Sequence, residues 1–87
     1  MTRRTVDISG KPVEVFDTGF AAMRWAKRQT EDCIVVARGK LYFQRKAGVE
    51  MTVRLNATDN AQNRHLVAAA NAVADAVEAL LAQDKAA

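Results

Sequence analysis

Few side chains in this sequence could carry out nucleophilic catalysis. The chain has one cysteine, Cys33, one histidine, His65, and one serine, Ser9, which falls in a predicted hairpin turn. Cys33 would act as a nucleophile only if the fold placed His65 beside it and a third group oriented the imidazole. Their simpler roles are a small apolar residue at the start of a strand and a polar residue near the start of a helix. We therefore predict that the protein is not an enzyme.

The pattern of potential ligands also argues against a bound metal or cofactor. A structural zinc site requires four nitrogen or sulfur ligands. This chain has one Cys and one His, and no CxxC or HxxxH spacing. Its four glycines fall in separate turns or caps, and none belongs to a phosphate-binding loop such as GxGxxG. We predict no metal and no cofactor.

Basic and aromatic residues of this sequence could bind a partner. The region with three consecutive predicted strands contains five cations and one tyrosine: Arg38, Lys40, Tyr42, Arg45, Lys46 and Arg54. We expect Tyr42 on the solvent face among these cations, where it could stack nucleic-acid bases while the cations contact phosphates. The alternative is a solvated face with ordinary cross-strand pairs, such as Tyr42 beside Thr52 or Arg54.

A second group of cations falls on a predicted helix. Over residues 20–29 a helical wheel places Arg24, Lys27 and Arg28 on one side, flanking Phe20, and the small apolar residues on the other. These cations would extend the basic surface of the sheet if the helix adjoins the sheet edge. We predict that both groups of cations bind the partner.

The charge of the chain is unevenly distributed. Residues 1–54 contain eleven Lys/Arg and six Asp/Glu, a net charge of +5, whereas residues 55–87 contain two and four, a net charge of −2. An asymmetric field of this kind favours an acidic partner for the front part of the chain. That partner is either an acidic protein surface or a nucleic acid.

Hydrophobic periodicity predicts seven elements of secondary structure. The predicted strands span residues 5–8, 13–16, 33–37, 41–45 and 50–55, and the predicted helices span 20–29 and about 59–83. Asp17-Thr18 offers an N-cap for the first helix, and Asp59 with Gln62 has the spacing of a capping box. Because the last three strands are separated only by turn-length gaps, we predict an α+β fold with an antiparallel sheet in the order β-β-α-β-β-β-α. Both helices are expected to pack on one face of it.

The last predicted helix is rich in alanine. Its apolar stripe is expected to pack on the sheet and consists of Leu66, Ala70, Val73, Val77 and Leu80, widened by Val67, Ala74 and Leu81. Small side chains cover much of the remaining surface and let another backbone approach closely, so we predict a homodimer interface at Ala68, Ala69, Ala72, Ala76 and Ala79. The alternative is that alanine is present because it is the best helix former.

The whole chain, residues 1–87, is short enough for one domain and has no linker. A single cysteine and the lack of a long apolar run predict a cytoplasmic protein without membrane contact. Its size and lack of catalytic motifs resemble, in style, the accessory proteins of phages and mobile elements, anti-CRISPR proteins among them. We therefore predict a regulator or inhibitor that acts by protein–protein interaction. The alternative is a nucleic-acid-binding module that uses a basic, Tyr42-containing sheet face.

Overall fold

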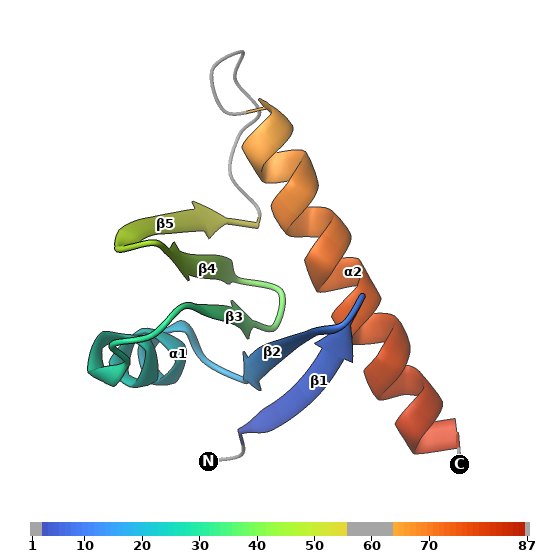
Figure 1. Cartoon of the computed structure of the whole chain (residues 1–87). Coiled ribbons are helices and arrows are strands. Elements are labelled where there is room, and N and C mark those ends of the chain that lie inside the picture. Colours follow the sequence, from blue (N-terminus) through green and yellow to red (C-terminus); the bar gives the residue numbers. More distant parts are fainter. Residues whose placement is uncertain (1–2, 56–63, 87) are drawn as a thin grey trace.

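The chain adopts the predicted order of strands and helices. A computed structural model describes residues 3–55 and 64–86, with side chains as far as Gln83. The elements are β1 (Arg4–Ile8), β2 (Lys11–Phe16), α1 (Gly19–Arg28), β3 (Cys33–Ala37), β4 (Leu41–Lys46), β5 (Val49–Arg54) and α2 (Arg64–Ala86) (Figure 1). The order β-β-α-β-β-β-α and the α+β class are confirmed. The predicted capping box at Asp59 lies outside the described residues.

The five strands form one mixed sheet in the order β1-β2-β3-β4-β5. Neighbouring strands joined by a tight turn are antiparallel, but β2 and β3 run parallel, with Glu14 opposite Val35 and Phe16 opposite Ala37. The prediction of a wholly antiparallel sheet is therefore wrong. The reason lies in the connection of residues 17–32, which contains α1 and returns the chain to the end of the sheet where β2 began, so β3 repeats the direction of β2.

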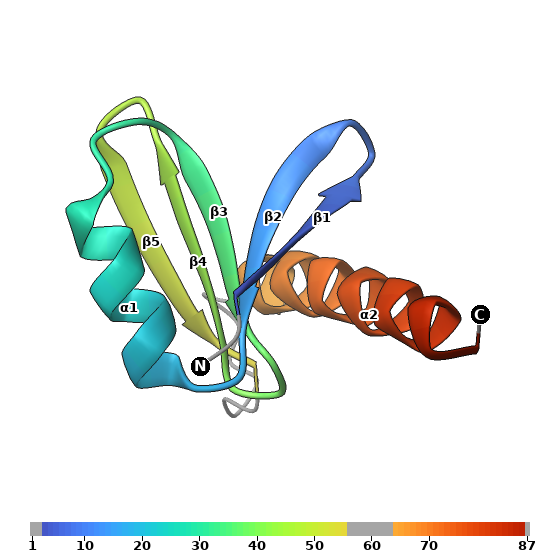
Figure 2. The same cartoon turned by 90° about the horizontal axis from the view of Figure 1, so that it is seen from below.

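The two helices cover opposite faces of the sheet, so the prediction that both pack on one face is also wrong (Figure 2). Val35 belongs to a core cluster with Ala22 and Ala26 of α1, whereas its neighbour Val36 belongs to a second cluster with Val77 of α2. Successive side chains of a strand point to opposite faces. Each face of the sheet therefore has its own apolar core and its own covering helix.

The turn between β4 and β5 decides where Tyr42 lies. Ala47 and Gly48 both have positive φ, 53° and 81°, and form a two-residue turn that pairs Lys46 with Val49. This register puts Tyr42 opposite Val53, on the face covered by α2. Tyr42 is 6% exposed. The prediction that it lies on the solvent face beside Thr52 or Arg54 is wrong.

The burial of Tyr42 leads to a prediction about its ionisation. Loss of solvation raises the pKa of the Tyr42 phenol above its usual value of about 10. Tyr42 is the only tyrosine in the chain, so an absorbance titration of phenolate reports on it alone. We expect a midpoint above that of the unfolded chain.

The same shift predicts how stability changes with pH. Because folding raises this pKa, the neutral phenol stabilises the fold fully below the unfolded pKa, and the stabilisation is lost as the pH rises through the folded value. Urea unfolding at alkaline pH should show this loss, and a Tyr42→Phe variant should lack this contribution to the pH dependence. A phenolate midpoint at or below the ordinary value in the folded protein would contradict the burial of Tyr42.

Helix α2 packs on β1, β4 and β5 through one face, which lies within the predicted apolar stripe. Of the stripe residues, Ala70, Ala74, Val77 and Leu81 are buried. Leu66, Val67, Val73 and Leu80 are half-buried at the flanks of this face. By length and apolar composition residues 64–83 could also cross a membrane, with a mean hydropathy of 1.4. A core helix of a soluble protein can share this property, so it is weak evidence about membranes.

Candidate partner-binding surfaces

The outer side of α1 presents one aromatic ring among three cations. We name Phe20, Arg24, Lys27 and Arg28 the α1 outer surface; all four are exposed. The helix is fixed at its start by Thr18, whose Oγ1 accepts a hydrogen bond from the Ala21 amide at 3.1 Å, as the predicted N-cap requires. Ala21, Ala22 and Ala26 are buried against the sheet on the opposite side. The predicted amphipathic character of the helix is therefore confirmed.

The exposure of Phe20 distinguishes this surface from an ordinary solvated helix face. Its side chain is 76% exposed, and within the described part of the chain Val49 is the other large apolar residue exposed to solvent. The sequence of α1 contains no acidic residue, so no carboxylate within the helix neutralises Arg24, Lys27 or Arg28. Lys27 and Arg28 also lie in the last turn, where the helix dipole favours positive charge. An apolar anchor ringed by cations suits a partner with an apolar pocket and an acidic rim.

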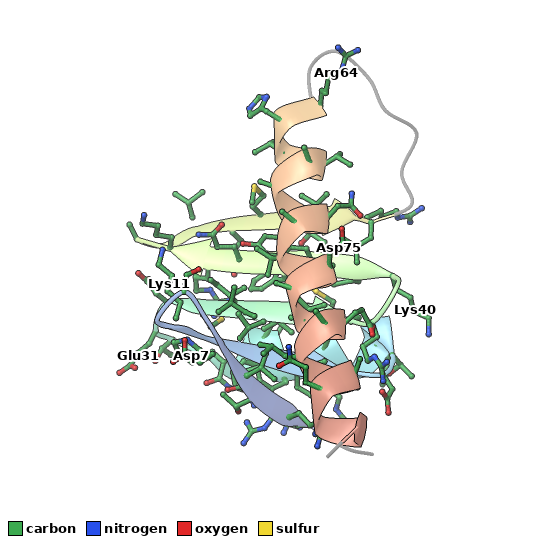
Figure 3. The ribbon with its side chains drawn as sticks, turned by 90° about the vertical axis from the view of Figure 1, so that its right-hand side faces the viewer. Asp7, Lys11, Glu31, Lys40, Arg64 and Asp75 are labelled. Carbon is green, nitrogen blue, oxygen red and sulfur yellow. The ribbon has the colours of Figure 1, made fainter. Side chains whose placement is uncertain are left out.

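The predicted sheet patch is divided between the two ends of the strands. Figure 3 shows Lys40 at one end and Lys11 and Glu31 at the other. The Lys40 ammonium donates a hydrogen bond to the Asp17 carbonyl at 3.2 Å. Arg38 donates two hydrogen bonds to the Glu78 carboxylate of α2, both at 2.9 Å, and this pairing raises the pKa of the Arg38 guanidinium further. Arg38 therefore joins α2 to the turn before β4.

The remaining cations of the patch have different surroundings. Arg45 is largely buried on the α1 face and donates hydrogen bonds to the carbonyls of Ala26 and Gln29. Lys46 is exposed at the same end of the sheet, and Arg54 is exposed near the opposite end, across from Leu41. With Tyr42 in the core, the structure does not bring these six residues onto one face.

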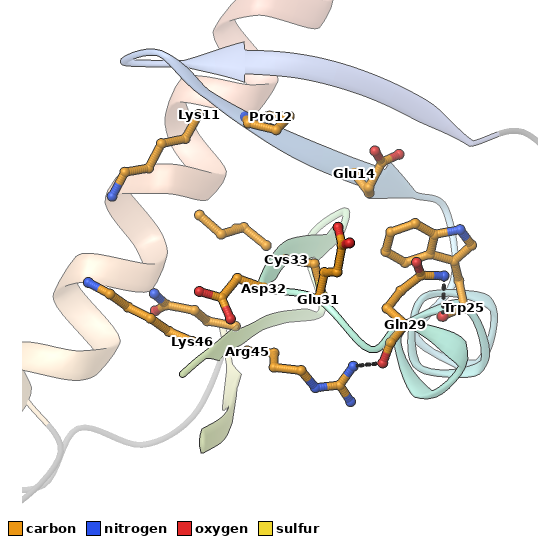
Figure 4. A pocket seen from close by; sticks show the side chains of 12 residues that line it. Lys11, Pro12, Glu14, Trp25, Gln29, Glu31, Asp32, Cys33, Arg45 and Lys46 are labelled. Atoms are coloured by element: carbon orange, nitrogen blue, oxygen red, sulfur yellow. Dashed lines mark hydrogen bonds between the residues drawn. The ribbon is translucent and has the colours of Figure 1, made fainter. Parts of the chain in front are cut away.

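A cleft of about 380 Å³ opens where β2 and β3 diverge (Figure 4). Their parallel pairing begins only at Glu14 and Val35; continued backward, the register would place Pro12 opposite Cys33. Proline has no amide hydrogen and cannot continue a ladder through its nitrogen. Apolar parts of Pro12, Trp25, Cys33 and Ile34 line the cleft, and its charged residues are Lys11, Arg45, Lys46, Glu14, Glu31 and Asp32. The sequence prediction missed this cleft, although Pro12, directly before the predicted strand 13–16, was a signal that the pairing stops there.

The charges around the cleft are balanced in sign, three cations and three carboxylates. Glu14 accepts hydrogen bonds from the Thr5 hydroxyl at 2.8 and 3.0 Å, and Asp32 accepts one from the Ala47 amide at 3.0 Å. Carboxylates at these positions oppose the approach of a polyanion such as nucleic acid. The cleft is therefore better suited to a polar or mixed-charge segment of a protein than to phosphates.

Cys33 and His65 do not form the nucleophile–base pair considered in the sequence analysis. Desolvation raises the pKa of the Cys33 thiol, although Arg45 acts in the opposite direction. Cys33 lies on the face covered by α1, whereas His65 is exposed on α2, which covers the other face. The sheet thus separates the two side chains. Within residues 3–55 and 64–86, no group of three or more His, Cys, Asp or Glu could hold a metal ion.

The alanines predicted to form a dimer interface lie mainly on the outer side of α2. Ala68, Ala69, Ala72 and Ala79 are exposed and Ala76 is half-buried. This placement leaves them accessible to another molecule. A homodimer through them stays a prediction.

Fold and surfaces together define a small α+β protein with a five-stranded mixed sheet, one helix on each face and a cationic, aromatic outer surface on α1. No protein-family model, curated protein or solved structure matches this chain. Its function is therefore argued from the geometry of its surfaces.

Proposed function

We propose that the protein is a small non-enzymatic regulator or inhibitor that binds an acidic protein surface through the α1 outer surface. The observation that carries this proposal is the 76% exposure of Phe20 beside the exposed cations Arg24, Lys27 and Arg28. A solvent-exposed phenyl ring contributes nothing to the core of this protein. It gains a role once a partner buries it.

The binding energy of a protein interface is usually concentrated in a few residues. Large side chains that enter a pocket at the centre of an interface contribute most of the affinity, and the surrounding residues exclude water. Here Phe20 would be the central residue, and the cations would speed the encounter and select an acidic rim. Arg24 lies four residues after Phe20 and Lys27 three further on, so they share one side of α1 with it.

The alternative function, nucleic-acid binding through a Tyr42-containing sheet face, loses its aromatic residue because Tyr42 is buried. The cations of that face are also divided between the strand ends, and two of them are engaged in hydrogen bonds with Glu78 and with the end of α1. We therefore favour a protein partner. A cytoplasmic accessory protein of a phage or mobile element fits the small size, the single free thiol and the absence of assembled chemistry in the described residues.

Charge reversal on α1 should abolish partner binding. The test compares wild-type protein with an Arg24→Glu/Lys27→Glu variant and with a Phe20→Ser variant, each used to capture proteins from bacterial lysate. Both variants leave the buried alanines of α1 unchanged, so the fold should survive. Loss of a central apolar residue costs about 2 kcal/mol or more of binding energy, roughly a 30-fold weaker affinity.

The matched control reverses two exposed cations elsewhere, Lys40→Glu/Lys46→Glu, and should retain the same captured protein. Capture that is unchanged by both α1 variants would contradict the proposal. A parallel titration with duplex and single-stranded DNA and RNA at about 50 and 200 mM salt tests the alternative. Micromolar binding that weakens steeply with salt would assign the α1 outer surface to phosphates instead.

A further inference from the structure

Strand β5 ends the sheet and leaves one side of its backbone without a described strand partner. In an antiparallel ladder alternate residues direct both their amide and carbonyl groups toward the neighbouring strand. The Leu55 amide donates to the Lys40 carbonyl at 2.9 Å, and Val49 pairs with Lys46 across the two-residue turn. The odd-numbered residues of β5 thus bond to β4. The even-numbered residues Glu50, Thr52 and Arg54 direct their backbone groups outward.

The side chains along this edge are self-complementary. If a second β5 lies antiparallel with the two Thr52 residues opposite each other, Glu50 of each copy faces Arg54 of the other. The backbone groups of these same residues point outward, so they would form the hydrogen-bonded pairs of the new ladder. Arg45 donates to only one oxygen of the Glu50 carboxylate, Oε1, and a carboxylate accepts at both. Opposite charges and Thr–Thr pairs are favourable when directly opposite in a sheet.

The other face of the same pairing is apolar. Met51 of one copy would face Val53 of the other, and the same register carried one step further brings Val49 toward Leu55. Val49 is 69% exposed, whereas Val53 and Leu55 are 8% exposed under α2. Val49 is therefore the one apolar side chain of β5 that is mostly exposed to solvent, and it would be covered. An edge strand with open backbone groups is otherwise a site of uncontrolled pairing.

We propose that the protein is a homodimer in which β5 of one copy pairs antiparallel with β5 of the second, centred on Thr52 and fixed by two reciprocal Glu50–Arg54 pairs. The two five-stranded sheets then form one continuous sheet. This assigns the dimer to β5 and not to the alanines of α2. Arg54, predicted as a partner-binding residue, would instead pair with Glu50 of the second copy.

The symmetry of this pairing has a consequence for binding. A two-fold axis perpendicular to a continuous sheet keeps corresponding faces together, so both α1 helices lie on the same face. A partner array could then bind two α1 outer surfaces at once and gain avidity from the linkage. This consequence rests on the proposed function, whereas the dimer itself does not.

A backbone variant tests the dimer directly. In Thr52→Pro the lost amide hydrogen points away from β4, so an edge strand of the monomer tolerates the change. We expect wild-type protein to have about twice the monomer mass of 9.5 kDa by light scattering after gel filtration, and Thr52→Pro to have the monomer mass. Thr52→Val keeps the amide and should remain a dimer. Thr5→Pro is the matched control on the other sheet edge, since Thr5 faces Glu14 in the alternate, non-bonded position and should leave the dimer intact.

A second variant avoids any change in the backbone. Arg54→Glu would place two carboxylates opposite each other at both ends of the interface and should give monomer, with an unchanged circular dichroism spectrum. Arg28→Glu makes the same charge change on α1 and should remain a dimer. A wild-type protein that is monomeric throughout a concentration series overturns the proposal. So does a dimer that survives both Thr52→Pro and Arg54→Glu but is lost in Ala72→Glu, which would assign the interface to α2.

Discussion

A Phe43→Ala variant is expected to lose about 3–5 kcal/mol of unfolding free energy, the usual range for truncating a buried phenylalanine. Phe43 is 1% exposed and lies in the cluster that joins α1 to the sheet. Its neighbours across that cluster include Ala22 and Ala26, which are too short to fill the space left by the ring. The cavity should therefore persist, and its cost adds to the lost burial.

The loss is large relative to the whole stability of the fold. A chain of this length has about 4–13 kcal/mol in total, on roughly 0.05–0.15 kcal/mol per residue. Urea denaturation at one fixed protein concentration measures the difference. Phe43→Leu retains most of the volume and should cost under about 1.5 kcal/mol. A Phe43→Ala variant within 1 kcal/mol of wild type would mean that α1 does not depend on this cluster.

Local signals in the sequence were sufficient to predict the helices and strands and, for some of them, the residues at which they begin or end. The Thr18 hydroxyl can accept a hydrogen bond from an otherwise unpaired helix amide, and in the structure it accepts from the Ala21 amide. The dipeptides Ser9-Gly10 and Ala47-Gly48 mark two-residue turns, and all four residues have positive φ. Each of these features depends on neighbours within a few residues. Sequence patterns can therefore report them directly.

The pairing of β2 with β3 and the placement of the helices depend on contacts that are distant in sequence. A helix between two strands is the usual connection of a parallel pair, and residues 17–32 contain one. The run Val35-Val36-Ala37 is also apolar at every position, which is typical of a strand buried on both faces. Read together, these signals favour parallel pairing and a helix on each face. The turn-length gaps around β4 report only the antiparallel pairing of β3, β4 and β5.

The candidate binding residues show the same difference between features set by local sequence and features set by distant contacts. The helical wheel alone located Phe20, Arg24 and Lys27, because exposure on a short helix follows from the period of its apolar residues. Tyr42 could not be placed in this way, because it is buried by α2, which is distant in sequence. The sequence predicts Arg45 as a surface cation, because its position does not show that the end of α1 lies beside it.

An Arg45→Met variant is expected to lose about 2–3 kcal/mol of unfolding free energy. The Arg45 side chain is only 11% exposed and donates to the carbonyls of Ala26 and Gln29 at the end of α1. The Ala26 carbonyl also accepts from the Gln29 amide at 3.1 Å, whereas the Gln29 carbonyl lies beyond the last turn of the helix. A hydrogen bond from a charged donor contributes about 1.5–3 kcal/mol. Methionine would keep much of the apolar stem but would leave both acceptors without the guanidinium.

Three observations separate this role from that of an ordinary surface ion pair. Glu50→Gln removes the exposed partner of Arg45; compared in the monomeric Thr52→Pro background, where Glu50 has no second copy to contact, it should cost at most about 1 kcal/mol, because Glu50 is 59% exposed. Arg45→Lys keeps the charge but cannot reproduce the forked geometry, so it should fall between wild type and Arg45→Met. Hydrogen exchange should show protection lost first in α1, which packs on the opposite face from α2. Equal losses for Arg45→Met and Glu50→Gln would show that Arg45 acts only through Glu50 and does not cap the helix.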